Sequence, residues 1–263
     1  MDKSCPAAGK NLNTALSHKM NIADAGFHMP QIELAEDEVQ LWRVDLEAIR
    51  SHEFRWQELL SSDEITRAAR FHFAADRQRF VASRAWLRTI LAAFLVTEPS
   101  ELSFCYSRNQ KPFLGAAHAE SGITFNLSHS GGIALYAFAR RREIGVDVEQ
   151  IRRDFDVESI AQRFFSISER EQLAALPESE KVEAFFRCWT RKEAYIKAIG
   201  EGLSLPLSQF DVSLEALETN ALLATRPDSA EAEQWMIREV SGGAGYSAAL
   251  CGRGRDWSLS HWH

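Results

Sequence analysis

The chain has 263 residues, 45% of them hydrophobic and 25% charged, and its formal net charge at pH 7 is −7. This composition is typical of a globular protein and excludes a disordered or fibrous one. The net acidity argues against a general nucleic-acid binder. The most apolar stretch, residues 86–96, is interrupted by Arg88 and is too short to cross a bilayer, so we expect no membrane role.

Two further features bear on where the protein works. Residues 1–6 lack the apolar segment of a secretory signal, so we expect a cytoplasmic protein. The cysteines lie far apart and form no C-x-x-C pair, which argues against a zinc ribbon, a redox motif or a disulfide framework. The four cysteines are Cys5, Cys105, Cys188 and Cys251.

Along the first half of the chain, residues 1–31 are polar and aperiodic, which predicts a loosely ordered N-terminal tail. Alternation over residues 39–46 predicts a strand. Apolar residues then recur at helical spacing until Pro99 ends the pattern, which predicts one long helix or two over residues 65–96. Between positions 65 and 90 only one acidic residue accompanies six arginines, and this basic segment predicts an anion site. The arginines are Arg67, Arg70, Arg77, Arg79, Arg84 and Arg88.

The second half begins with three strand-like segments that predict an antiparallel meander, at residues 123–128, 133–139 and 144–149. Helices are expected at residues 160–165, 168–176 and 180–199. Ser168 and Glu171 predict a capping box for the second helix, and Gly200 ends the third. Strands return at residues 210–214, 234–240 and 246–251. We therefore expect an α+β fold of two similar α/β halves, each a small sheet packed by helices, with the active site between them; the halves are residues 32–141 and 142–263.

The segment 144–149 carries two acidic residues on one strand face. Alternation turns Ile144 and its apolar neighbours to the core and places Asp147 and Glu149 together on the other face. Their separation of roughly 6 to 7 Å lets both carboxylates converge on one hard cation. Gly145 on the same face leaves room for a ligand. The alternative is an acidic face that only meets solvent.

The segment 185–197 places an acid and an amine beside a large aromatic residue. Trp189, Glu193 and Lys197 follow at i, i+4 and i+8, so they share one helix face. A third carboxylate and a cation could therefore face the acidic strand. The alternative is an exposed Glu–Lys pair that adds little stability.

Two further segments offer groups that bind phosphate. Ser128 and His129 precede two glycines at a strand end, where a hydroxyl, an imidazole and backbone amides come together. No glycine stands two places before either serine of this segment, so a serine-hydrolase nucleophile elbow is disfavoured. Arg108 and Lys111 lie in a basic turn that could hold phosphates together with the basic segment. The alternatives are a polar turn with a structural histidine and a solvated basic turn.

Taken in order, these segments resemble the signature blocks of the Sfp-type 4′-phosphopantetheinyl transferases. The blocks are residues 125–131, 144–149 and 189–197 with 200–203, and residues 110–112 resemble the block before them. The resemblance runs from about residue 41 to residue 251. The N-terminal tail lies outside it, and the basic segment matches only loosely.

The resemblance implies transfer of phosphopantetheine from coenzyme A to a serine of an apo acyl or peptidyl carrier protein, with Mg²⁺ and release of adenosine 3′,5′-bisphosphate. It implies Asp147, Glu149 and Glu193 as metal ligands. Glu193, directly or through a metal-bound water, is the first candidate for the base, and Glu169 is the second. Lys197 would stabilise or protonate the departing phosphate oxygen.

The resemblance also implies the coenzyme A contacts. Ser128 and His129 correspond to a phosphate-binding pair and Lys111 to a residue beside the adenine, whereas Arg67 and Arg84 follow from helix register alone. Candidate carrier-protein contacts are Phe164, Phe165 and residues 140–142, although core packing is the better explanation for the phenylalanines.

Several alternatives stay open at this point. A metal-dependent nuclease fits the acidic charge poorly, and a non-catalytic module that binds coenzyme A or a carrier protein would not need every one of these groups. The pathway, fatty-acid or secondary-metabolite synthesis, is not distinguished. Because both halves lie in one chain, we expect a monomer.

Overall fold

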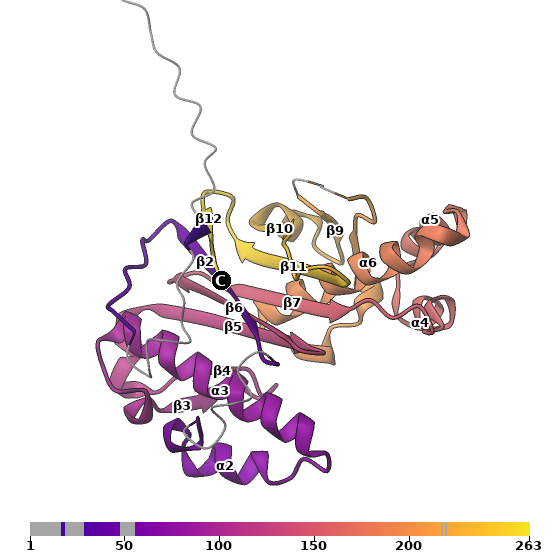
Figure 1. The fold of residues 1–263 in the computed structure, drawn as a ribbon. Helices are drawn as coiled ribbons and strands as arrows, with labels where there is room; N and C mark the ends of the chain where they lie inside the picture. The colour runs from indigo at the N-terminus through magenta and orange to yellow at the C-terminus, as the bar shows by residue number, and fades with distance from the viewer. Residues whose placement is uncertain (1–16, 19–28, 48–55, 217, 219) are drawn as a thin grey trace, which may run out of the picture.

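The computed structural model describes residues 17–18, 29–47, 56–216, 218 and 220–263. Two sheets pack face to face, and a long helix covers the outer face of each (Figure 1). The molecule is therefore α+β, with a small sheet and its helices in each half, as predicted. Within the described residues, no helix combines the length and the apolar character that a membrane span requires.

The helices are α2 (Ser62–Ala68), α3 (Ala74–Leu95), α4 (Val157–Phe164), α5 (Ile167–Ala175) and α6 (Glu178–Ile199). The expected helical stretch over residues 65–96 is two helices, α2 and α3, with a break between them. The capping box of α5 joins Ser166 and Glu169, so the prediction of Ser168 and Glu171 was wrong by two residues.

The first sheet has the order β1-β12-β2-β6-β5, in which β6 is antiparallel to both of its neighbours, β2 and β5. Its strands are β1 (Ser17–His18), β2 (Glu38–Asp45), β5 (Ile123–Ser130), β6 (Ile133–Arg140) and β12 (Ser258–Trp262). The last strand, β12, was not predicted, and it runs parallel to β2 although it belongs to the range 142–263. Of the predicted tail, Ser17–His18 pairs with β12, whereas residues 1–16 and 19–28 lie outside the described residues.

The second sheet is antiparallel, with the order β10-β11-β7, and its strands are β7 (Ile144–Gln150), β10 (Trp235–Glu239) and β11 (Tyr246–Arg253). The predicted meander was therefore wrong for its third strand, because β7 pairs with β11 and not with β6. Two small hairpins complete the fold: β3 (Phe104–Tyr106) with β4 (Pro112–Leu114), and β8 (Phe210–Val212) with β9 (Leu222–Thr225).

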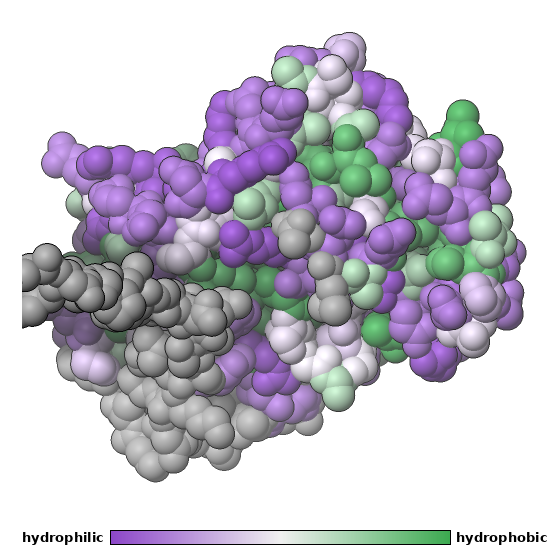
Figure 2. Space-filling view, turned by 90° about the horizontal axis from the view of Figure 1, so that it is seen from above, coloured by the Kyte–Doolittle hydropathy of each residue, from purple (hydrophilic) through white to green (hydrophobic). Residues whose placement is uncertain are grey.

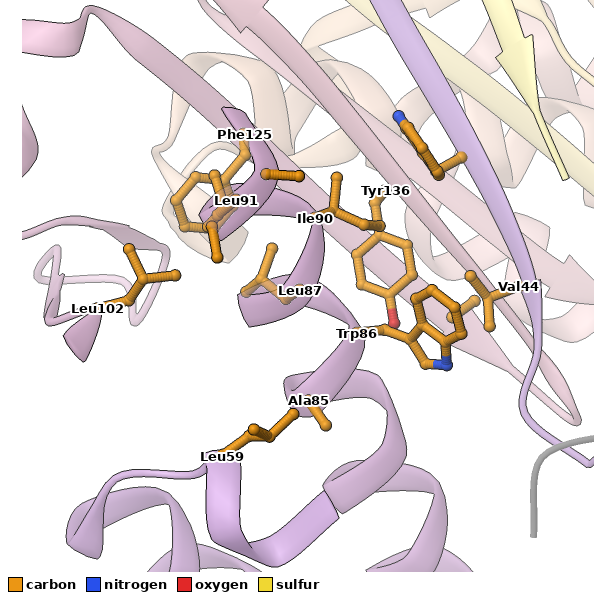
Figure 3. Close-up of a cluster of buried hydrophobic side chains, with 14 of the residues drawn as sticks. Val44, Leu59, Ala85, Trp86, Leu87, Ile90, Leu91, Leu102, Phe125 and Tyr136 are labelled. Atoms are coloured by element: carbon orange, nitrogen blue, oxygen red, sulfur yellow. The ribbon is translucent and has the colours of Figure 1, made fainter. Parts of the chain in front are cut away.

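The core of the first half forms between α3 and the outer face of the first sheet. Trp86, Leu87 and Ile90 of α3 are buried near Tyr136 of β6 and Val44 of β2 (Figure 3). Burial of such side chains supplies about 25 cal/mol per Å² of apolar surface, so this cluster fixes α3 on the sheet.

The two sheets meet along a second apolar layer. Val146 and Val148 of β7 pack there with Leu41 of β2 and Leu135 of β6. The intervening residue Asp147 turns to the opposite face, as the alternation predicted. One face of β7 packs against the first sheet, and its other face packs against α6.

Helix α6 approaches β7 closely because of one glycine. A Cβ atom on Gly145 would lie 2.2 Å from the carbonyl oxygen of Ala194 and 2.3 Å from the amide nitrogen of Ala198. The space beside this glycine therefore holds the helix backbone and not a ligand, which corrects the expectation from sequence.

The surface seen from above is mainly hydrophilic, and hydrophobic residues gather mostly toward the side where α4 and α5 lie (Figures 1 and 2). Ile167 of α5 is 67% exposed.

Candidate active site

A cavity of about 550 Å³ lies between the two halves. One wall comes from α2, α3 and the β3–β4 hairpin, and the other from the facing ends of β5 and β7 and from α6. The residues that line it are Arg67, Phe71, Phe80, Ser83, Arg84, Tyr106, Gln110, Pro112, Leu127, Ser128, His129, Asp147, Glu149, Trp189, Glu193 and Lys197. The structure thus brings together eight of the eleven residues that the sequence analysis assigned to the site: Arg67, Arg84, Ser128, His129, Asp147, Glu149, Glu193 and Lys197.

Asp147 is the centre of the polar network in this cavity. Its Oδ1 accepts hydrogen bonds from Lys197 Nζ at 2.6 Å and from Ser128 Oγ at 2.9 Å. Its Oδ2 is buried and has no hydrogen-bond partner among the described residues. A buried carboxylate oxygen without a partner is costly, so this atom is suited to a cation.

Glu149 and Glu193 lie within electrostatic reach of Asp147. Burial raises the pKa of Glu193, and the charges of Asp147 and Glu149 raise it further. Burial also raises the pKa of Glu149, and Asp147 adds to that rise, while a hydrogen bond from Ser130 opposes it. Three carboxylates that disfavour one another's charge are stabilised by a bound cation.

No group of three acidic, histidine or cysteine side chains in the described parts of the chain already has the spacing of a metal centre. The residues still fit a hard cation in their chemistry, because the donors are carboxylate oxygens and Asp147 Oδ2 is uncommitted.

His129 lies beside this network. Desolvation by the surrounding protein atoms lowers the pKa of its imidazole, and the positive charges of Lys197 and Arg79 lower it further. Arg79 itself binds Asp76 and Glu47. Helix register also suggested Arg79 for the site, after Arg67 and Arg84, but Arg79 does not line the cavity.

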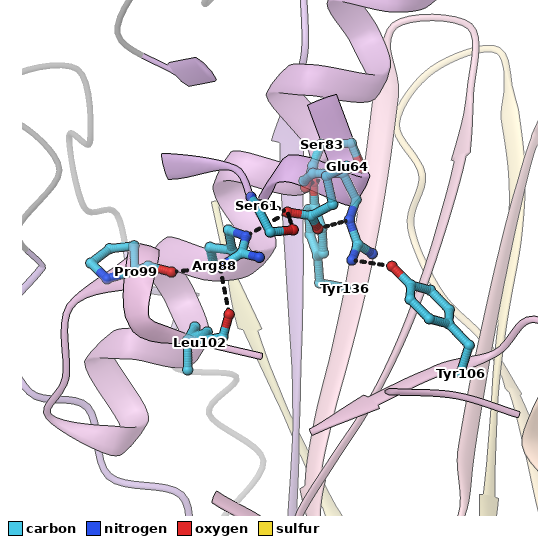
Figure 4. Close-up of polar contacts among 9 residues, drawn as sticks. Ser61, Glu64, Ser83, Arg88, Pro99, Leu102, Tyr106 and Tyr136 are labelled. Carbon is cyan, nitrogen blue, oxygen red and sulfur yellow. Dashed lines mark hydrogen bonds and ion pairs between the residues drawn. The ribbon is translucent and has the colours of Figure 1, made fainter. Parts of the chain in front are cut away.

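The cavity wall formed by α2, α3 and the β3–β4 hairpin contains a buried ion cluster (Figure 4). Glu64 is 1% exposed and receives Arg84 Nε on one oxygen at 2.5 Å and Arg88 Nε on the other at 2.7 Å. Arg84 also donates to Tyr106 Oη at 3.2 Å, and Arg88 donates to the carbonyls of Pro99 and Leu102. Two guanidinium groups share one carboxylate, so the wall keeps a positive charge next to the cavity.

Lys111 does not line the cavity. Its Nζ donates to the carbonyl oxygens of Ile144, Lys197 and Ala198, with the shortest distance, 2.6 Å, to Lys197. Burial lowers its pKa to about 8. This amine therefore ties the β3–β4 turn to the end of α6 and the start of β7.

Glu169 also lies away from the cavity. It is completely buried, pairs with Lys192 Nζ at 2.7 Å, accepts the amide of Val212 and closes the capping box with Ser166. These contacts use both carboxylate oxygens, so we do not propose it as a base. The Ser-x-x-Glu spacing before an apolar helix was the sequence signal for this structural role.

The remaining candidates lie outside the cavity. Arg108 is exposed in the β3–β4 turn. Phe165 is 2% exposed and belongs to the core, whereas Phe164 is half-buried with its ring edge-on to Trp189 at 5.8 Å. Arg140 and Arg142 donate to backbone carbonyls, and Arg140 pairs with Ile123 at the start of β5, whereas the cavity residues of β5 lie near its end.

The sequence analysis missed Phe71 and Tyr106 as lining residues. Neither has a local pattern that distinguishes it from a core aromatic residue, because only the packing of α2 and of the β3–β4 hairpin brings them to the cavity.

Comparison with known proteins shows the family to which this chain belongs. The family model described as "4'-phosphopantetheinyl transferase superfamily" matches residues 143–251, and the one described as "4'-phosphopantetheinyl transferase, N-terminal" matches residues 48–140. The 4'-phosphopantetheinyl transferase HetI of Nostoc sp. is 42% identical over 234 residues, which cover 89% of this chain and 95% of that protein. The putative 4'-phosphopantetheinyl transferase slr0495 of Synechocystis sp. is 35% identical over 69% of this chain and 72% of that protein. The 4'-phosphopantetheinyl transferase Sfp of Bacillus subtilis is 31% identical over 75% of this chain and 84% of that protein. This chain belongs to the 4′-phosphopantetheinyl transferases, the enzymes that transfer phosphopantetheine from coenzyme A to carrier proteins.

Proposed function

We propose that this enzyme catalyses the Mg²⁺-dependent transfer of the 4′-phosphopantetheine arm from coenzyme A to a serine of an apo acyl or peptidyl carrier protein, with release of adenosine 3′,5′-bisphosphate. The observation that carries the proposal is the uncommitted, buried Oδ2 of Asp147 in a cavity that also holds two further carboxylates, Lys197 and His129.

Asp147, Glu149 and Glu193 are the residues that would hold the Mg²⁺. When bound, the ion would neutralise negative charge on the pyrophosphate of coenzyme A and on the phosphate that leaves. Burial raises the pKa of Glu149 and of Glu193, and the charge of Asp147 raises both further, which supports a shared cation.

Glu193 is our candidate for the general base. The serine hydroxyl of the carrier protein forms a bond to phosphorus and loses its proton, and the bridging P–O bond of the pyrophosphate breaks. Glu193 would take that proton directly or through a metal-bound water, because its carboxylate lines the cavity beside Lys197. Lys197 lies one helical turn further on and lines the same cavity, and its ammonium group would donate a hydrogen bond to the departing phosphate oxygen.

Ser128, His129, Arg67 and Arg84 are proposed to bind the phosphates of coenzyme A, since all four line the cavity. Lys111 would act indirectly, by holding the β3–β4 turn beside α6. Arg108 is exposed in that turn and is the candidate for an outer contact with the coenzyme.

The carrier protein is proposed to dock at the mouth of the cavity, on the segment between α2 and α3. Phe73 is 66% exposed and Phe71 is 37% exposed, next to the exposed arginines Arg70 and Arg77. No salt bridge to either arginine is present among the described residues. An aromatic patch flanked by unpaired positive charge complements an acidic surface with an apolar centre, which is the chemistry expected of a carrier protein.

The test is intact-mass spectrometry of apo acyl and peptidyl carrier proteins after incubation with the enzyme, coenzyme A and Mg²⁺. A gain of one phosphopantetheine arm is expected, and both EDTA and the substitution Asp147→Asn should abolish it. Transfer that persists at full rate in EDTA would refute the metal dependence. No mass gain on any carrier, with coenzyme A binding intact by calorimetry, would refute the proposed reaction.

A further inference from the structure

The edges of the two sheets are joined by side chains instead of a backbone ladder. β5 is the last strand of the first sheet and β7 the last strand of the second, and they lie side by side without strand pairing. The bonds across this seam come from every second residue of β5, and we call these residues the seam column. It consists of Thr124, Asn126, Ser128 and Ser130.

The chemistry of the seam column changes along β5. At the start of the strand, Thr124 Oγ1 donates to the carbonyl of Arg142 at 2.5 Å, and Asn126 Oδ1 accepts the amide of Val146 at 2.8 Å. At its end, Ser128 and Ser130 donate to carboxylates of β7. The column therefore joins the halves at one end and holds two of the three cavity carboxylates at the other.

Ser130 has a fixed hydrogen-bond direction. Its Oγ accepts the amide of Gln150 at 3.1 Å and donates to Glu149 Oε2 at 2.7 Å. An amide can only donate, so the hydroxyl proton of Ser130 is directed to the carboxylate.

Glu149 depends on this bond more than Asp147 does on its own serine. Asp147 accepts hydrogen bonds from both Ser128 and Lys197. Among the described residues, the bond from Ser130 is the one side-chain hydrogen bond or salt bridge to Glu149. Glu149 stands near the end of β7 and is only half-buried, so packing alone does not fix its rotamer.

We propose that Ser130 is a positioning residue for Glu149, which it holds in place for the cation that Glu149 shares with Asp147 and Glu193. The inference rests on the proposed Mg²⁺-dependent function. It assigns a role to the third polar residue of the Ser128-His129-Ser130 segment. A partner that orients a ligating carboxylate is worth 10- to 100-fold in metal affinity in other proteins.

The test compares Ser130→Ala with two matched variants. Ser130→Thr keeps the hydroxyl, and Thr124→Val removes a hydroxyl of the same seam column that reaches only backbone carbonyls. Mn²⁺ binding is measured by electron paramagnetic resonance with coenzyme A present, alongside the melting temperature and the KM for carrier protein.

Ser130→Ala should weaken Mn²⁺ binding by about tenfold with little change in melting temperature, and Ser130→Thr should restore most of the affinity. Thr124→Val should bind Mn²⁺ as the wild type does. Wild-type affinity in Ser130→Ala, or an equal loss in Thr124→Val, would overturn the role of Ser130 while the proposed function stands. A wild-type protein that neither binds Mn²⁺ nor transfers phosphopantetheine would overturn both.

Discussion

Gly145 is where a single methyl group should damage the site from outside the cavity. In Gly145→Ala the new Cβ would lie 2.2 Å from the carbonyl oxygen of Ala194, whereas ordinary contact begins at 3.4 Å, so β7 and α6 must separate by about 1.2 Å. The atoms it meets are backbone atoms of a helix, which cannot rotate away. Overpacking of this kind costs about 3 kcal/mol, which corresponds to a fall of roughly 8 °C in melting temperature for a chain of this size.

The same displacement should slow turnover, because α6 carries Glu193 and Lys197 while β7 carries Asp147. A shift of about 1 Å between such groups typically costs 10²-fold in rate. The assay is phosphopantetheine transfer at saturating substrates, together with thermal unfolding. Gly132→Ala is the matched control, since its Cβ would meet only the flexible side chain of Glu47. Wild-type stability and turnover in Gly145→Ala would refute the packing argument.

Three further predictions concern the rest of the molecule. Glu64→Gln should lower the free energy of unfolding by about 3 kcal/mol in urea titrations, because two buried guanidinium groups lose their shared counter-charge; a change below about 1 kcal/mol would contradict this. Phe73→Ser should raise the KM for carrier protein by about tenfold and leave the KM for coenzyme A unchanged, whereas the similarly exposed Leu223→Ser should change neither; equal effects on both KM values would count against the docking surface. Burial lowers the folded-state pKa of Lys111 from 10.5 to about 8, so the unfolded chain holds this proton more tightly than the folded chain does. The destabilisation caused by burying the charged amine therefore disappears as pH rises from 8 to 10.5. The free energy of unfolding should therefore rise over that window in the wild type relative to Lys111→Met, and parallel curves would show that Lys111 does not titrate there.

The local geometry of the site was predictable from sequence wherever one element carries it. Strand alternation placed Asp147 on the face opposite Val146, and helix register placed Glu193 and Lys197 in the same cavity. Both predictions rest on the backbone period of a single strand or helix, which a run of apolar residues records directly.

Contacts between elements were not predictable in this way. Nothing in residues 144–149 distinguishes a strand that continues the first sheet from one that begins the second, because both choices bury the same apolar face. The pairing with β11 depends on residues about a hundred positions away. For the same reason β12, which crosses from the second half to the first sheet, carried no local signal of its partner β2.

The titratable residues illustrate the same limit in chemical terms. Glu169 and Glu193 are both glutamates near aromatic residues, and Lys111 and Lys197 are both lysines of the signature blocks. These residues differ in what their polar atoms contact. Those of Glu169 and Lys111 bond to backbone groups or form a buried ion pair, whereas Lys197 and Glu193 face the cavity. A group whose hydrogen bonds are fully used by the fold cannot exchange them for substrate without loss of stability. The proposed catalytic residues are therefore those that face the cavity, and any change that alters the spacing between β7 and α6 should alter the chemistry without touching a catalytic atom.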